Sequence, residues 1–309
     1  MKNVSFTVLF IFASLFFINY TATCEKRIWN KESGWVEIDD LPTETLDQRY
    51  RHALALITDQ QYLRAIQELE ILIKEAPDSE FVEPCMFNIA HAYYLANDLK
   101  KAFKTYEKFL ENFPGTRRTK EIIEKQYNLA VEQMNGLEVK SAINMFEGII
   151  ANNQHGPYAP DAQVKIADCY QKLKKFDSAI ENYEKLINDY SDSAWVQYAQ
   201  FQIPMCKIED ERRQDRNYGL LTEAEDGFND YMAKNPQGTL VEEVRKKMTD
   251  IQTAKAEKEF KIAEFYLRKK KPKSAKVYYE IVVDNFPETV WSAKATEKLK
   301  FLRNIGAIK

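Results

Sequence analysis

The stretch AYYLANDLKKAFKTYEKFLENFP, residues 92–114, decides the fold because its spacing recurs along the chain. Counted from Ala102, an aromatic residue follows after four positions, an apolar residue after seven and a proline after twelve, and another alanine stands twelve positions earlier. These residues are Tyr106, Phe109, Pro114 and Ala90. Small alanines on two successive helices let the backbones approach closely, while the aromatic side chain fills the gap to the next helix pair. The proline ends the second helix, since it has no N–H and clashes with the preceding turn.

The same frame occurs about six times. The reference alanines, Ala65, Ala102, Ala142, Ala179, Ala224 and Ala275, stand 37, 40, 37, 45 and 51 residues apart. A single helix pair cannot bury its apolar face alone, so successive pairs stack into a solenoid. The copies resemble tetratricopeptide repeats. The sequence therefore predicts an all-α solenoid of about six helical hairpins, closed by a C-terminal capping helix over SAKATEKLKFLRNIG, residues 292–306.

The composition favours the same fold class. Nine glycines and ten prolines in 309 residues indicate helices joined by short turns, and 45% hydrophobic with 29% charged residues is typical of a well-cored protein. The net charge of −3, from 44 basic and 47 acidic residues, gives no global field that would attract nucleic acid or an anionic bilayer. We therefore expect no nucleic-acid partner.

The first residues, 1–24, differ from the rest of the chain. MKNVSFTVLFIFASLFFINYTATC has one early lysine, an apolar run from Val4 to Ile18, and then small and polar residues. This pattern predicts an export signal. The alternative is a membrane anchor, but the apolar run is shorter than the roughly 20 residues that a spanning helix needs.

The end of this segment bears on its processing. Thr21-Ala22-Thr23-Cys24 resembles the lipobox of bacterial lipoproteins, in which the cysteine receives lipid and becomes the mature N-terminus. Thr21 and Thr23 stand where a lipobox usually has leucine and a glycine or alanine, so ordinary cleavage near Cys24 stays open. If Cys24 is lipidated, the resemblance and the following Glu25 imply sorting to the outer membrane.

The chain is divided as follows: an export signal over 1–24, an extended tether over 25–45, repeats one and two over 46–118, repeats three and four over 119–192, the fifth repeat with an insertion over 193–238, and a long helix, the sixth repeat and the cap over 239–309. In the tether, Trp29 and Trp35 flank a turn at Ser33 and Gly34. We expect both tryptophans to pack on the first repeat. The alternative is that they bind a partner.

Two places interrupt the repeat. Pro204 falls inside the first helix of the fifth copy, where we expect a kink, and ERRQDRNYG, residues 211–219, is predicted to form a projecting loop. Before the sixth copy, residues 239–270 contain no helix breaker and predict one long helix. The basic run RKKKPK, residues 268–273, falls at the following turn and is interpreted as solvated, with contact to anionic headgroups or an acidic partner as the alternative.

No catalytic or metal-binding motif is found in the sequence. The histidines, His52, His91 and His155, lie in different copies of the repeat and outside any HExxH pattern. Cys85, Cys169 and Cys206 lack ligand spacing and are predicted to be buried helix thiols rather than disulfide or metal-site residues. We therefore expect a binding protein without a cofactor, not an enzyme.

The predicted binding surface is the concave face, which is lined by the first helix of each pair. Side chains three positions before, one after and four after the alanine of that helix should point into it. In the first three copies these residues are Tyr50, Leu54 and Ile57, then Phe87, His91 and Tyr94, then Tyr127, Val131 and Met134. The groove is apolar and aromatic and suits an extended or helical peptide. The alternative is that neighbouring copies cover some of these side chains, Leu54 and Val131 above all.

Three features together resemble one family. They are the export signal ending in Cys24, the segment AHAYYLANDLKKAFKTYEKFLENFP at 90–114, and the insertion and long helix from RRQDRNYG at 212 through AEFY at 263. They are similar to the BamD family of the outer-membrane β-barrel assembly machinery. The resemblance implies a lipid-anchored, periplasm-facing protein. It also implies that the C-terminal repeats dock on the periplasmic domains of the barrel-forming subunit, and that the C-terminal signals of unfolded outer-membrane proteins are bound.

The sequence also departs from that family. Its well-known members have about five repeats, and the additional copy here falls near 119–192. An arginine that those members carry in the long helix is replaced by Thr253 and Ala254, so that contact is not transferred. The alternative function is that of a periplasmic repeat protein of the Tol-Pal and cell-division class. Such proteins usually carry an N-terminal coiled coil, and 25–45 has no heptad pattern.

Overall fold

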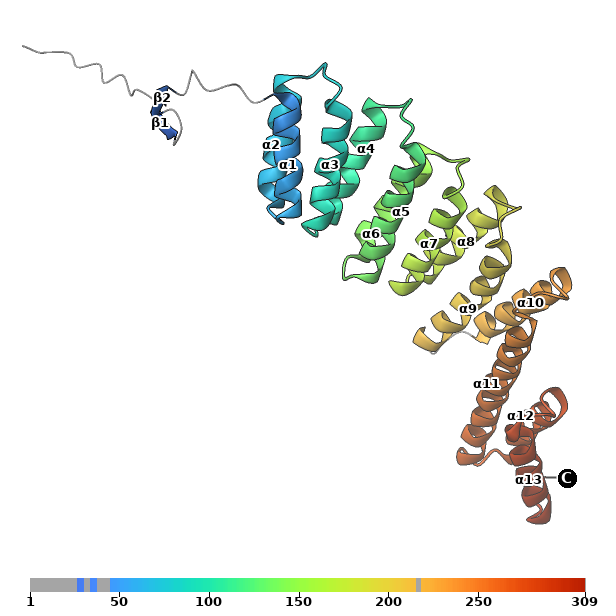
Figure 1. Cartoon of the computed structure of the whole chain (residues 1–309). Coiled ribbons are helices and arrows are strands. Elements are labelled where there is room, and N and C mark those ends of the chain that lie inside the picture. Colours follow the sequence, from blue (N-terminus) through green and yellow to red (C-terminus); the bar gives the residue numbers. More distant parts are fainter. Residues whose placement is uncertain (1–26, 31–33, 38–44, 215–217, 309) are drawn as a thin grey trace, which may run out of the picture.

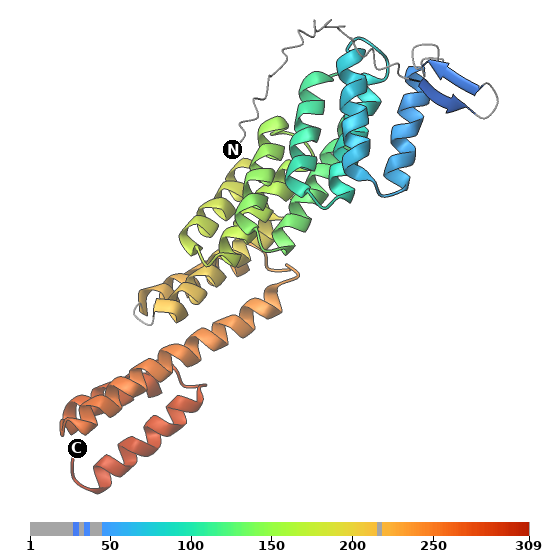
Figure 2. The ribbon, with the colours of Figure 1, turned by 90° about the vertical axis from the view of Figure 1, so that its left-hand side faces the viewer.

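The computed structural model describes residues 27–30, 34–37, 45–214 and 218–308. Within these residues the chain forms thirteen helices and one pair of short strands. Figure 1 shows the helices from α1 to α8 side by side in a curved row, followed by α9 and α10. Figure 2 shows α11, the long orange helix, leading away from this row to the C-terminal helices. The predicted all-α solenoid of helical hairpins is confirmed.

The hairpins follow one another in sequence order. The helices are α1 Leu46–Thr58, α2 Tyr62–Glu75, α3 Val82–Leu95, α4 Leu99–Asn112, α5 Thr119–Asn135, α6 Val139–Asn152, α7 Ala159–Lys172, α8 Phe176–Asp189, α9 Val196–Gln214, α10 Tyr218–Lys234, α11 Val241–Arg268, α12 Pro272–Asn285 and α13 Val290–Asn304. The odd-numbered helices up to α11 are the first helices of the pairs, and α13 is the predicted capping helix.

The alanine frame organises the core. Its members on the paired helices all have 0% of their surface exposed: Ala53, Ala65, Ala90, Ala102, Ala130, Ala142, Ala167, Ala179, Ala224, Ala263 and Ala275. The aromatic residues four positions after the reference alanines, such as Tyr106 and Tyr183, are fully buried between helices. The second helices α2 and α4 end two residues before Pro77 and Pro114. The predicted register is therefore confirmed.

Four of the turns inside the hairpins share one backbone feature. Gln60, Asn97, Lys174 and Lys270, each five positions before a reference alanine, have φ values between 56° and 62°. The third repeat is different, because α5 has 17 residues where α3 and α7 have 14, and its turn runs through Gly136 at φ −78°. In that turn Leu137 is fully exposed.

The fifth repeat forms the joint to the C-terminal part. The helix α9 continues past Pro204, which packs against Gly227 of α10: a Cβ atom added to Gly227 would lie 3.3 Å from Cβ of Pro204. The prediction of a projecting loop over 211–219 was wrong in large part, because α9 extends to Gln214 and α10 begins at Tyr218. Residues 215–217 lie outside the described residues.

The helix α11 confirms the long helix that the sequence predicted, and it joins two cores. Val244 and Ile251, in its N-terminal half, pack with α9 and α10. Phe260 and Ala263, in its C-terminal half, pack with α12 and α13. One continuous helix therefore carries the C-terminal hairpin.

The N-terminal segment contains a small hairpin instead of a simple extended tether. The strand β1, Arg27–Asn30, pairs antiparallel with β2, Gly34–Glu37, and Trp29 stands opposite Trp35. The predicted packing of the two indole side chains on the first repeat, and the predicted lipidation of Cys24, lie outside the described residues.

The three helical cysteines are free and buried, as predicted. Burial raises the pKa of the Cys85 thiol to about 11 and those of Cys169 and Cys206 to about 12, so the thiols stay protonated near neutral pH. In the described part of the chain, none of the helices combines the length and the apolar character needed to cross a membrane.

Candidate functional site

The predicted groove residues lie on α1, α3 and α5, the first helices of three successive hairpins. The structure divides them into two groups. Most of them pack between neighbouring helices, and two of them line a cavity.

Three aromatic residues of the predicted groove hold helices together. The Tyr50 ring lies 5.5 Å from the Phe81 ring, and its hydroxyl accepts a 2.8 Å hydrogen bond from Nδ2 of Asn88. Phe87 meets the buried Tyr106 ring edge-on at 6.0 Å. Tyr127 lies 5.8 Å from Phe146 and 5.4 Å from Tyr158, and burial followed by the nearby Asp161 raises the pKa of Tyr127 to about 12. These rings are half-buried and form contacts within the solenoid.

Two cations lie over the ring of Phe87. The guanidinium carbon of Arg118 lies 4.3 Å from the ring centroid, and Nζ of Lys125 lies 5.7 Å from it. Both cations come from the next repeat in the chain, at the start of α5 or just before it. A ligand at this point would therefore meet positive charge over an aromatic ring instead of a bare ring.

The aliphatic members of the predicted groove are half-buried. Ile57 packs on the core of the first two repeats, and Val131 and Met134 pack on the larger core that runs from α3 to α7. Leu54 is half-buried on α1. The backbone carbonyl of Met134 accepts a 2.7 Å hydrogen bond from Nζ of Lys172, which links α5 to α7.

His91 and Tyr94 line a cavity of about 150 Å³ between α3 and α5. Their rings are stacked, with centroids 6.3 Å apart, and Tyr94 is 42% exposed. The remaining walls are Tyr106, Lys125, Asn128, Leu129 and Glu132. The cavity combines aromatic walls with one cation and one anion at its mouth, which suits a side chain and a polar backbone group of a peptide.

Burial and the charge of Lys125 both act on the titratable groups of the cavity, and Nζ of Lys125 lies 3.9 Å from Oε1 of Glu121. Burial and then the charge of Lys125 lower the pKa of His91, so the imidazole is neutral at pH 7. Burial also raises the pKa of Tyr106, whose hydroxyl stays protonated. The ammonium group of Lys125 is thus the positive charge that a ligand in this cavity would meet.

In later repeats the same register carries acids that the sequence analysis did not single out. Asp168 and Glu264 each directly follow the alanine of a first helix, the position that His91 occupies in the second repeat. Asp168 accepts hydrogen bonds from the hydroxyls of Tyr183 at 2.7 Å and Tyr198 at 3.2 Å. Extending the spacing past the third copy would have found both acids. At this one register position the side chain therefore changes from Leu54, His91 and Val131 in the first three repeats to an acid in the fourth and sixth.

Glu264 is held in the same manner as Asp168. Its carboxylate accepts hydrogen bonds from the hydroxyl of Tyr279 and from Nζ of Lys298, the second at 2.9 Å. Burial alone would raise the pKa of Glu264, but these two donors lower it below its usual value. Both acids are thus tied to buried tyrosines, and among the described residues no group of histidines, cysteines and acids could hold a metal ion.

A comparison with known protein families identifies the family to which this helical solenoid belongs. Residues 42–123 and 122–305 match the model of the YfiO family, described as outer membrane lipoprotein. The chain belongs to this family. The YfiO match covers every helical hairpin, so the family and the solenoid describe the same part of the chain.

Individual relatives within the YfiO family are distant. The outer membrane protein assembly factor BamD of Vibrio cholerae is 22% identical over 160 residues, which is 47% of this chain and just under two thirds, 66%, of that protein. BamD of Rickettsia prowazekii is 23% identical over 175 residues, 56% of this chain and 69% of its own length. Among solved structures, a MamA protein is 20% identical, covers 63% of this chain and 94% of its own, and has a TM-score of 0.36.

Proposed function

We propose that this protein is a periplasm-facing scaffold that helps to assemble β-barrel proteins into the outer membrane. The observation that carries the proposal is the YfiO family match over the whole solenoid, together with relatives that are named BamD assembly factors. A stacked-hairpin solenoid offers an extended surface for binding. In this proposal Cys24 carries the lipid that holds the scaffold at the membrane. Stable anchoring takes more than one acyl chain, so the lipid on Cys24 must supply several.

The proposed site for unfolded substrate peptides is the cavity between α3 and α5. A cavity of about 150 Å³ is large enough for one aromatic ring. His91 and Tyr94 offer ring faces, and Lys125 offers a positive charge for a peptide carboxylate. The half-buried Tyr50, Phe87 and Tyr127 support this surface from the helix interfaces.

The proposed docking surface for the periplasmic domains of the barrel-forming subunit lies on the C-terminal helices. Large apolar side chains are exposed there on α11, on α13 and at the residue that follows α13: Ile262 at 37%, Phe265 at 47%, Phe301 at 56% and Ile305 at 58%. Exposed apolar side chains of this size, set among lysines and glutamates, are typical of a protein interface.

Two variants test the two surfaces against each other. Tyr94→Ala is expected to weaken binding of a fluorescent peptide, taken from the C-terminus of an outer-membrane barrel protein, by about tenfold, because an aromatic contact is lost. Phe301→Ala is expected to reduce recovery of the barrel-forming subunit from detergent-solubilised membranes while leaving peptide affinity unchanged. Recovery of Tol-Pal components in place of that subunit would refute the assembly function.

Mass spectrometry of the mature N-terminus tests the attachment. A lipid-modified Cys24 is expected. An unmodified terminus at or near that residue would leave a periplasmic scaffold without an anchor and refute this part of the proposal.

A further inference from the structure

The second helices carry two grooves on the face of the solenoid that they form. The larger, about 940 Å³, lies between α4 and α6, and the smaller, about 440 Å³, lies between α2, α3 and α4. Lys101 and Lys104 of α4 line both. The helix α4 is thus a ridge between two hollows, and neither hollow contains any residue of the predicted peptide groove.

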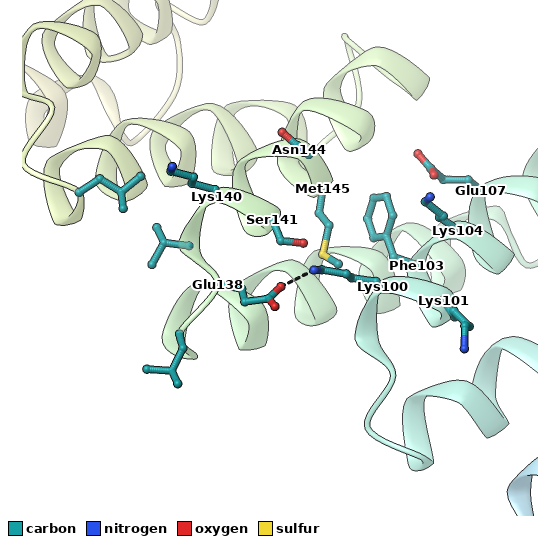
Figure 3. A pocket seen from close by; sticks show the side chains of 13 residues that line it. Lys100, Lys101, Phe103, Lys104, Glu107, Glu138, Lys140, Ser141, Asn144 and Met145 are labelled. Atoms are coloured by element: carbon teal, nitrogen blue, oxygen red, sulfur yellow. Dashed lines mark ion pairs between the residues drawn. The ribbon is translucent and has the colours of Figure 1, made fainter.

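The larger groove has an apolar floor. Phe103, Val139 and Met145 are buried at its base, and Leu137, which is fully exposed, and the half-buried Leu173 stand at its edge. Figure 3 shows Phe103 and Met145 between the ribbons of the two helices, with lysines around them. Such a floor accepts apolar side chains from a partner.

A glycine limits this groove on one side. A Cβ atom on Gly148 of α6 would lie 2.9 Å from Oε1 of Glu107 and 3.4 Å from the Phe103 ring of α4. The two helices therefore approach closely at Gly148. The groove extends from there toward the turn that holds Leu137, the turn in which the third repeat departs from the others.

The rim of the larger groove has an excess of positive charge. Lys100, Lys101, Lys104 and Lys140 line it, against Glu107 and Glu138. Figure 3 shows the ion pair that joins Lys100 to Glu138, and Lys101 pairs with Asp98 at 2.9 Å. In the part of the chain that the structure describes, Lys104 and Lys140 have no ion-pair partner within 4.0 Å, and Lys108 of the smaller groove has none either.

The lysines also stand where the helices least favour them. Lys100 and Lys101 lie in the first turn of α4 and Lys140 in the first turn of α6, and the acids at these helix ends are the N-cap residues Asp98 and Glu138. The helix macrodipole gives these ends a positive partial charge, so a lysine in the first turn is unfavourable there. The lysines that these acids do not pair, Lys104 and Lys140, therefore attract carboxylates to a groove whose floor accepts apolar side chains.

We propose that the α4 ridge and its two grooves bind an acidic, amphipathic polypeptide segment of a partner protein. Its carboxylates pair with Lys104, Lys108 and Lys140, and its apolar side chains enter the groove beside Leu137. The recessed apolar floor favours a polypeptide over an anionic bilayer, because flat headgroups would not fill it. This binding surface is separate from the proposed substrate and docking surfaces, and the proposal does not depend on them.

The experiment uses the full chain and a labelled synthetic peptide of about 18 residues, or five helical turns, with leucine on one face and glutamate on the other. Fluorescence anisotropy measures its binding against that of a second peptide with lysine in place of glutamate. The acidic peptide is expected to bind at least about tenfold more tightly, and the difference should shrink as salt is raised.

Matched variants locate the binding. The double variant Lys104→Glu/Lys140→Glu and the single variant Leu137→Ser are each expected to weaken the acidic peptide by about tenfold or more. Lys185→Glu and Val277→Ser, exposed residues on α8 and α12, are expected to leave affinity unchanged. All five positions are exposed, so none of the substitutions removes a buried side chain.

Three outcomes would overturn the proposal. The first is equal affinity for the acidic and basic peptides. The second is an affinity that the groove variants leave unchanged. The third is binding to vesicles of phosphatidylglycerol and phosphatidylcholine that depends on Lys104 and Lys140 while the acidic peptide does not bind, which would assign the ridge to the membrane.

Discussion

The repeats from α3 to α8 and the joint between α9 and α11 are held together in different ways. In the repeats, fully buried alanines such as Ala90 and Ala102 let helices nest against buried aromatic rings. At the joint, Lys255 of α11 pairs with Glu225 of α10, and Lys258 of α11 pairs with Glu211 of α9. Lys255 and Glu211 are only 7% and 8% exposed in these pairs. Apolar packing continues through the joint, where Val244 and Ile251 of α11 join the core of α9 and α10. Among the residues that the structure describes, however, the ion pairs that include a side chain less than 10% exposed are found at this joint.

This difference indicates what each contact does for the molecule. Packing of small residues against aromatic rings stabilises each hairpin on its neighbour in the same way. It therefore does not determine where the row of hairpins ends. A buried ion pair adds little net stability, but it is satisfied in one geometry only. We infer that the pairs at Lys255 and Lys258 fix the direction in which α11 leaves the row, and with it the position of the C-terminal hairpin.

The largest expected effect comes from breaking the joint. Glu225→Leu would remove the carboxylate with which the buried ammonium group of Lys255 pairs, and Gln252 would lose the same acceptor. We expect a loss of about 3 kcal/mol in the free energy of unfolding, measured by urea denaturation.

The double variant Glu225→Leu/Lys255→Met tests the cause. It removes both charges, so most of the lost stability should return. Lys234→Ala, which removes an exposed pair with Asp230, should change stability by less than about 1 kcal/mol. A double variant as unstable as the single one would show that packing, not charge, determines the joint.

The next effect comes from the nested repeats. Ala102→Leu adds three carbons where the alanine is 0% exposed, between α3 and α4, and is expected to destabilise by about 1–3 kcal/mol through overpacking. Ala55→Leu, at an exposed position of α1, makes the same chemical change without a packed neighbour. Equal melting temperatures for these two variants would refute the interlocking role of the frame.

Sequence alone revealed the nested part far better than the joint. The alanine, aromatic and proline spacing predicted the helices because each interaction spans a few turns and recurs. Glu211 gave no such signal: it lies in a charged run that was interpreted as a loop, yet it is buried against Lys258, 47 residues away. Charges on a helix face look alike whether water or another helix covers them.

The candidate site shows the same limit within the repeats. The repeat register predicted that His91 and Tyr94 lie on one face of α3, and in the structure both line one cavity. Register could not show that Arg118 and Lys125, from the following repeat, cover Phe87. Contacts between neighbouring copies depend on the lengths of the helices and turns between them.

A buried amide tests whether all repeats are equally well packed. Gln126 of α5 and Gln163 of α7 hold the same repeat position, four before the alanine, and both are 1% exposed. Nε2 of Gln163 donates to Oδ1 of Asn182 at 3.0 Å, whereas the side-chain atoms of Gln126 have no hydrogen-bond partner among the described residues. Gln126→Met should therefore stabilise by about 1–2 kcal/mol in urea denaturation. Gln163→Met should not, because it breaks a satisfied pair, and equal gains would contradict this account.

The smallest expected effect concerns the turn of the C-terminal hairpin. Lys270 has a φ of 57°, a left-handed conformation that a side chain with a Cβ atom disfavours. Lys270→Gly should stabilise by about 0.5–1 kcal/mol, because glycine adopts this φ without a Cβ clash. Its neighbour Lys269 has a φ of −81°, so Lys269→Gly should only increase the entropy of the unfolded chain and slightly destabilise. If both variants lost stability equally, the left-handed conformation of Lys270 would carry no strain. The turns at Lys270 and Asn97 would then share a backbone conformation without sharing an energetic cost.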